Sequence, residues 1–233
     1  MPNTVSRRTA GGLIAAAIVA APTAALADGA VDMQLVLAVD TSGSVNRTRF
    51  ELQRDGYANA FRTPEVQRVV LGGRAGGIAV CLTHWTGPGL NAISQEWIRL
   101  GDATACTAFG NAITAAPRLL FAGGTSISGA IDHSRLMFSR CPFSGIGGKA
   151  PRRVIDVSGD GENNRGRSPD SARDEAVALD ITINGLPILA IEPNLDDYYR
   201  DHVIGGPGAF LIAAQTFEMF GDAVRRKLIQ EIA

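Results

Sequence analysis

The chain has 233 residues, of which 45% are hydrophobic and 19% are charged, and its formal net charge is −1. This length suits one medium-sized domain with a proper hydrophobic core. The sequence carries no basic stripe, which argues against nucleic acid or an anionic membrane as a partner. Internal repeats, heptad runs and long polar low-complexity tracts do not occur in it.

Residues 1–27 read as a secretory signal peptide, with a basic start at Arg7 and Arg8. The apolar stretch 11–21 is too short to span a bilayer, and Ala-Leu-Ala at 25–27 is a small-x-small cleavage site. Adjacent arginines hint at twin-arginine export, although ordinary leaders also contain them. Without Arg7 and Arg8, 20 basic residues remain against 23 acidic ones. We expect a periplasmic or secreted mature domain, 28–233, with no membrane span.

Strand and helix patterns alternate along the mature chain, which predicts a largely parallel sheet covered on both faces. The first half predicts strands over 33–39, 78–86 and 92–100 and helices over 46–62 and 102–116. The Gly-Pro-Gly turn at 87–89 makes the second and third strands a hairpin with an antiparallel edge strand. The second half predicts strands over 153–158, 182–191 and 209–213, and helices over 126–139, 170–179, 195–202 and from 217 to 228.

The expected fold is therefore α/β and doubly wound. It has a mostly parallel sheet of about six strands with one antiparallel edge strand, and helices on both faces. Asp156 lies inside a predicted strand, and a buried carboxylate needs a partner, for which Arg152 or Arg153 is the nearest choice. The three cysteines favour one disulfide and one buried thiol, with Cys81 as the thiol and Cys106–Cys141 as the preferred pair.

Polar residues follow the predicted strands at the points where ligands bind in open α/β sheets. Residues 40–44 read Asp-Thr-Ser-Gly-Ser and come directly after the apolar run 35–39. A glycine turn then carries Thr125, and a second apolar strand ends in Asp160-Gly161. Hydroxyl and carboxylate oxygens suit a hard cation such as Mg²⁺. The simpler interpretation is that Asp40 or Ser42 caps the following helix.

The positions that match one for one resemble the metal-ion-dependent adhesion site (MIDAS) of von Willebrand factor A domains, which has the form Asp-x-Ser-x-Ser, then Thr, then Asp-Gly. They are Asp40, Ser42, Ser44, Thr125 and Asp160. The resemblance covers residues 32–231. Runs 155–161 and 181–188 look like an uncharacterised family of secreted bacterial proteins within that superfamily, to which no activity is assigned.

This resemblance implies that the hydroxyls of Ser42, Ser44 and Thr125 touch Mg²⁺, or Mn²⁺ or Ca²⁺, and that Asp40 and Asp160 lie one water away. Neutral ligands leave the cation much of its charge and an open position, so an acidic side chain of a protein partner could complete the octahedron. The implied function is a secreted, non-enzymatic protein-binding module. In one departure, Gly159 stands where the superfamily commonly has threonine before Asp-Gly.

Two alternatives remain. A phosphatase of the haloacid-dehalogenase type would use Asp40 as nucleophile and the run 159–164 as its late motif, but Ser42 and Asn164 replace two expected aspartates. Loss of a proton shuttle costs such a reaction roughly 10²–10⁴-fold. A structural domain with a vestigial metal site is the other alternative. Glu162, Asn163 and Asn164 could tune the site or line the partner surface, but a solvated turn is the simpler interpretation.

Overall fold

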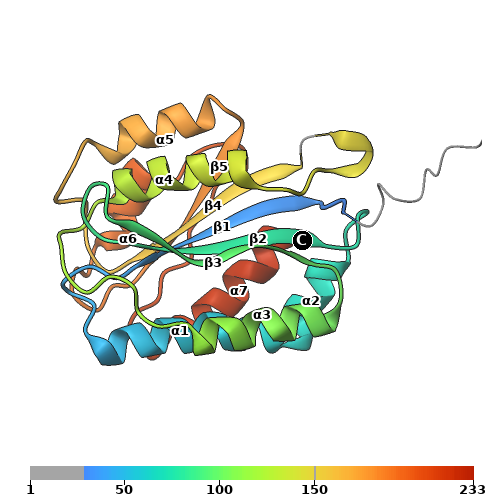
Figure 1. Ribbon diagram of the computed structural model, residues 1–233. Coiled ribbons are helices and arrows are strands. Elements are labelled where there is room, and N and C mark those ends of the chain that lie inside the picture. Colours follow the sequence, from blue (N-terminus) through green and yellow to red (C-terminus); the bar gives the residue numbers. More distant parts are fainter. Residues whose placement is uncertain (1–28, 150) are drawn as a thin grey trace, which may run out of the picture.

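The computed structural model describes residues 29–149 and 151–233, so the leader predicted over 1–27 lies outside the described residues. These residues form one five-stranded sheet between two helical layers (Figure 1). The strand order is β3-β2-β1-β4-β5, with every neighbouring pair parallel except β2 and β3. The prediction of a doubly wound α/β fold with one antiparallel edge strand is confirmed.

The central strands are buried on both faces, which explains their nearly continuous apolar sequences. The strands are β1 (Met33–Asp40), β2 (Ile78–Trp85), β3 (Asn91–Leu100), β4 (Arg152–Gly159) and β5 (Ile181–Pro187). Alternate β1 residues such as Leu35 and Leu37 enter one core, while Val36 and Ala38 enter the other. Parallel pairing brings the carboxyl ends of β1, β2, β4 and β5 to a single edge of the sheet.

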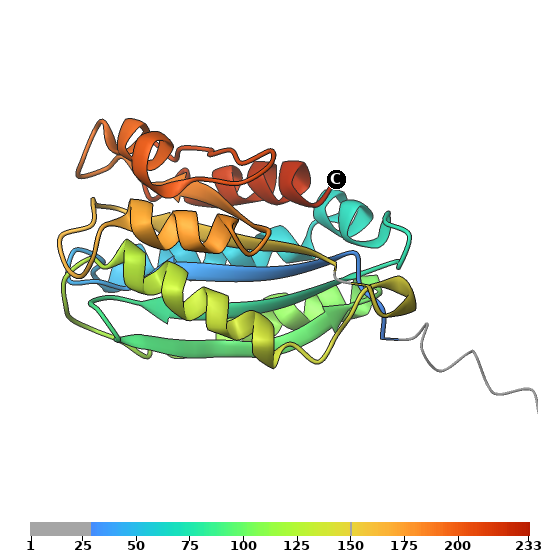
Figure 2. The same ribbon diagram turned by 90° about the horizontal axis from the view of Figure 1, so that it is seen from above.

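The helices divide between the two faces of the sheet (Figures 1 and 2). One face carries α1 (Arg47–Arg62), α2 (Pro64–Leu71), α3 (Ala103–Ala115) and α7 (Phe220–Ile232). The other carries α4 (Ile127–Arg140), α5 (Pro169–Val177), α6 (Leu195–Tyr198) and the π-helical turn Tyr199–Val203. A 3₁₀ turn, Ile146–Gly148, precedes β4. None of the helices in the described ranges is long and apolar enough to cross a membrane.

Two side-chain caps fix where the helices beside the carboxyl edge begin. The Asn46 side chain accepts a hydrogen bond from the Arg49 amide at 3.0 Å, and the Ser126 hydroxyl accepts one from the Gly129 amide at 3.2 Å. Such caps satisfy amides that the first helical turn leaves free. Ser42 caps neither helix, and α1 starts at Arg47, five residues after it, which leaves the 40–44 loop for another role.

Two predictions about secondary structure are corrected. Helix α2 was not expected, because Pro64 indicated only the end of the preceding helix, whereas proline is also favoured at a first helical position, where it stands here. The expected strand over 209–213 forms only isolated bridges to the β5 side, at Leu211 and Ala214, so the described sheet has five strands rather than about six.

The cysteine prediction is correct for Cys81 and wrong for the disulfide. All three cysteines in the described part of the chain are free thiols, and Cys81 is buried as expected. Cys106 packs into the core under α1 and α7, whereas Cys141 follows α4, which covers the opposite face. The sheet lies between the two thiols, and a disulfide allows a Cα separation of no more than about 7 Å.

The buried partner of Asp156 is a lysine from the end of the chain rather than Arg152 or Arg153. The Lys227 Nζ atom lies 2.8 Å from Asp156 Oδ1 and 3.1 Å from Glu231 Oε1, and all three side chains are buried. Burial lowers the pKa of Lys227, but the two carboxylates outweigh this effect and raise it overall. This cluster ties α7 to the centre of the sheet, because an unpaired buried charge would be costly.

Candidate metal site

The predicted site residues come from three loops at the carboxyl edge of the sheet, at the left of Figure 1. The loops are 40–44 after β1, 123–126 before α4 and 159–164 after β4. Each loop contacts the other two. The Gly43 amide donates to the Gly123 carbonyl at 3.1 Å, and the Ser44 hydroxyl donates to Asp160 Oδ1 at 2.6 Å. The Asn164 side chain accepts from the Thr125 amide at 2.9 Å.

Four of the five predicted residues form one chain of hydrogen bonds. The Ser42 amide donates to Asp40 Oδ1 at 2.6 Å, which orients the carboxylate towards its own turn. The Oγ atoms of Ser42 and Ser44 lie 3.1 Å apart, and Ser44 continues the chain to Asp160. Ser44 is exposed, whereas Asp40, Ser42 and Asp160 are each at most 1% exposed. The site therefore opens to solvent at its serine end and is closed beneath its carboxylates.

Thr125, the fifth predicted residue, is fixed beside this chain by its backbone. The Asn164 side chain accepts a hydrogen bond from the Thr125 amide. The backbone amides of Asn164 and Arg165 donate to the Thr125 carbonyl at 2.9 and 3.1 Å. The Thr125 hydroxyl lies 3.9 Å from the position that a Cβ on Gly161 would occupy, directly after Asp160. Residues 162–164 are more than a solvated turn: Glu162 and Asn164 are exposed, but Asn164 also joins the second loop to the third.

The two aspartates are buried without enough partners to support two negative charges. Asp40 Oδ2 and Asp160 Oδ2 accept no hydrogen bond from any described residue. Burial and the nearby charge of Asp160 raise the pKa of Asp40 to about 7. Burial also raises the pKa of Asp160, although Ser44 and Arg49 oppose the shift. The nearest cation, the Arg49 guanidinium, stays 4.0 Å from Asp160 Oδ2. The site thus has a deficit of positive charge.

A divalent cation fits the residues present. Neighbouring ligands of an octahedral Mg²⁺ ion at about 2.1 Å lie about 3.0 Å apart, close to the 3.1 Å between the Oγ atoms of Ser42 and Ser44. Across residues 29–149 and 151–233, no three His, Cys, Asp or Glu side chains are grouped as metal ligands. Hydroxyl oxygens would therefore provide the direct contacts, and the buried carboxylates would provide charge behind them.

Gly159, the departure from the superfamily pattern, has a steric cause. A Cβ at this position would lie 2.9 Å from the Tyr199 hydroxyl oxygen, 3.1 Å from Asp40 Oδ2 and 3.2 Å from the Trp85 ring. Tyr199 and Trp85 are fully buried, so neither can move aside easily. These two aromatic side chains occupy the space that a threonine would need, close to Asp40.

Sequence reasoning missed the residues that surround the five. Arg49 donates to the Ser44 carbonyl at 2.7 Å, and Arg118 donates to the Thr41 carbonyl at 2.8 Å, so two arginines hold the 40–44 loop from outside. Glu192, after β5, accepts from the Glu162 amide at 2.9 Å. Burial, followed by the charges of Glu162 and Asp160, raises its pKa. The place of Arg49, the third residue of α1, could have indicated its role, but no local motif distinguishes Arg118 or Glu192.

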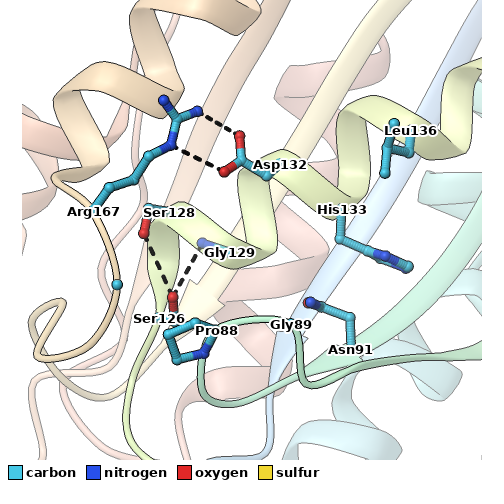
Figure 3. A pocket seen from close by; sticks show the side chains of 11 residues that line it. Pro88, Gly89, Asn91, Ser126, Ser128, Gly129, Asp132, His133, Leu136 and Arg167 are labelled. Atoms are coloured by element: carbon cyan, nitrogen blue, oxygen red, sulfur yellow. Dashed lines mark hydrogen bonds and ion pairs between the residues drawn. The ribbon is translucent and has the colours of Figure 1, made fainter.

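A groove of about 460 Å³ adjoins the Thr125 loop, between the start of α4 and the turn before β3 (Figure 3). Ser126 and Ser128 line it, and the Ser126 hydroxyl caps α4. Arg167 crosses its rim to Asp132, with guanidinium nitrogens 2.6 and 3.1 Å from the carboxylate oxygens. The groove places polar and apolar surface next to the candidate metal site.

Residues 30–233 match the family described as "Protein of unknown function (DUF1194)". The chain belongs to this family. No curated protein matches its sequence. The family and the fold agree with the resemblance drawn from the sequence, because solved von Willebrand factor A domains share this fold at low identity.

Three solved structures illustrate the likeness. Proximal thread matrix protein 1 from the mussel byssus, with a zinc-occupied MIDAS motif, gives a TM-score of 0.60 at 14% identity, over 86% of this chain and 48% of that one. The pilus adhesin SpaC of Lactobacillus rhamnosus GG gives 0.60 at 17% identity, over 87% and 30%. A von Willebrand factor type A protein from Catenulispora acidiphila gives 0.56 at 12%, over 87% and 43%. The chain spans less than half the length of each.

Proposed function

We propose that this protein is a secreted or periplasmic module that binds a protein partner through a divalent cation held by Ser42, Ser44 and Thr125. The observation that carries the proposal is the pair of buried aspartates whose Oδ2 atoms have no hydrogen-bond partner among the described residues, beside two hydroxyls 3.1 Å apart. The zinc-occupied MIDAS motif of the mussel protein supports a metal in this fold. Mg²⁺ is the cation we favour, with Mn²⁺ or Ca²⁺ as substitutes.

The protein groups divide the work between them. The serine and threonine hydroxyls would contact the ion, while Asp40 and Asp160 would supply negative charge from behind and hold its waters. A bound ion with neutral ligands offers a positively charged open position to an incoming carboxylate. Exposed Ser44 marks the side from which an acidic side chain of the partner can approach. No group in this arrangement is placed as a nucleophile with a proton shuttle, so we propose binding rather than catalysis.

Calorimetric titration with Mg²⁺ and Mn²⁺ tests the metal half of the proposal. The wild type should bind one equivalent, and Thr125→Val, which removes one hydroxyl and keeps the shape, should weaken binding about tenfold or more, or about 1.4 kcal/mol. Thr107→Val is the matched control, because this hydroxyl donates to the Ala103 carbonyl on α3. Absence of saturable binding by the wild type would leave a structural domain.

A retention assay tests whether the protein binds a partner through the metal. Immobilised metal-loaded protein should retain proteins from a periplasmic extract, and both a chelator and Ser44→Ala should abolish that retention. The same extract passed over Thr107→Val protein should behave like the wild type. Retention that persists in chelator would contradict a metal-dependent contact.

A further inference from the structure

Glu192 enters the metal site from a fourth loop, which follows β5 and is not part of the superfamily pattern. One carboxylate oxygen, Oε2, accepts the Glu162 amide at 2.9 Å, which fixes the orientation of the group. The other, Oε1, lies 3.2 Å from the position that a Cβ of Gly161 would take. The side chain is only partly buried, so Glu192 stands on the open side of the site rather than beneath it.

The distance between Glu192 and the predicted ligands is short. Thr125 Oγ1 lies 3.9 Å from the same point above Gly161, and Glu192 Oε1 lies 3.2 Å from it, so the two oxygens are at most about 7 Å apart. Asp160 lies between Gly161 and Ser44, to which it is hydrogen-bonded. Glu192 therefore lies against Glu162 and Gly161, which belong to the same loop as Asp160.

We propose that Glu192 is a third carboxylate beside the metal site, which does not coordinate the ion but raises the affinity for it through its negative charge. This inference rests on the proposed function. Gly161 allows Glu192 to approach this loop, because a Cβ at position 161 would lie only 3.2 Å from Glu192 Oε1. The unpartnered buried oxygens of Asp40 and Asp160 independently point to a cation on the inner side of the same space.

The expected effect follows from Coulomb's law. An ion about 2.1 Å from Thr125 Oγ1 would lie within about 9 Å of Glu192 Oε1. A unit negative charge about 7–9 Å from a divalent ion in a medium as polar as water changes the binding constant roughly five- to tenfold. Glu192→Gln removes the charge and keeps an oxygen for the Glu162 amide, so a purely structural role would leave metal affinity unchanged. Glu162→Gln is the matched control: it removes an exposed charge from the adjoining loop and leaves the Glu162 amide in place.

The experiment is a calorimetric titration of the full mature chain with Mg²⁺ and Ca²⁺, at pH 8 and low ionic strength. We expect Glu192→Gln to bind both ions five- to tenfold more weakly than the wild type, and Glu162→Gln to stay within about twofold. Equal affinities of the wild type and Glu192→Gln, or equal losses in both variants, would overturn the assignment of Glu192 and leave the proposed function standing. A wild type that binds neither ion would overturn both.

Discussion

Asp40→Asn should stabilise the metal-free protein while abolishing its metal binding. Asp40 is fully buried, and its pKa of about 7 stands far above its ordinary value of 3.8. The folded state therefore holds a proton that the unfolded chain releases between pH 4 and 7, so stability falls as the pH rises through that window. About three pKa units correspond to about 4 kcal/mol at pH 8.

The asparagine variant recovers part of this free energy. Its side-chain oxygen can still accept the Ser42 amide, but its NH₂ group takes the place of an oxygen that has no described partner, at a cost of about 1–3 kcal/mol. A net gain of about 1–3 kcal/mol is expected at pH 8. The gain should be about 2.5 kcal/mol smaller at pH 5, where folded Asp40 is already protonated.

Urea unfolding followed by far-UV circular dichroism, in chelator at both pH values, measures this difference. Added Mg²⁺ should then stabilise the wild type and leave Asp40→Asn unchanged, because only a protein that binds the ion gains free energy from it. Equal destabilisation of the variant at pH 5 and pH 8 would refute the reasoning, since Asp40 would then be a structural hydrogen-bonding residue and not a charge kept for a cation.

Three further results are expected. Lys227→Met should lower the free energy of unfolding in urea by about 3–5 kcal/mol, because it leaves two buried carboxylates without a cation. Lys149→Met, at an exposed position, should change it little, and similar values for both variants would show that the buried ion pairs do not stabilise the fold. Gly159→Thr should cost about 1–3 kcal/mol through its clash with Tyr199, and a stabilised variant would contradict the packing described. All three cysteines should react with a thiol reagent on unfolding without reductant, whereas a single reactive thiol would indicate a disulfide.

The fold could be predicted because its signals are local. A few neighbouring residues are enough to predict each element: the apolar runs of β1 and β4, the glycine turn before β3, and the apolar stripes on α1 and α7. Helix α2 was not predicted because a proline can either follow the end of one helix or occupy the first position of another. The segment at 209–213 has strand-like residues, but whether such a segment joins a ladder depends on its neighbours, and here only isolated bridges form.

The site could be predicted only as far as its motif reaches. Asp40, Ser42, Ser44 and Asp160 lie at the carboxyl edge because the parallel strands β1 and β4 end there, whereas Thr125 is placed beside them by the loop before α4. The partner of Asp156 was assigned to a neighbouring arginine, but burial selected Lys227 from the last helix. Glu192 and Arg118 lie on loops that carry no motif, so their contacts with distant residues could not be predicted from the local sequence.

Anomalous diffraction from a crystal soaked in Mn²⁺ tests the central claim most directly. The account predicts one strong peak at the carboxyl edge of the sheet, about 2.1 Å from the hydroxyl oxygens of Ser42, Ser44 and Thr125, with both aspartates one water further out. A peak elsewhere, or none at a saturating concentration of the ion, would contradict it.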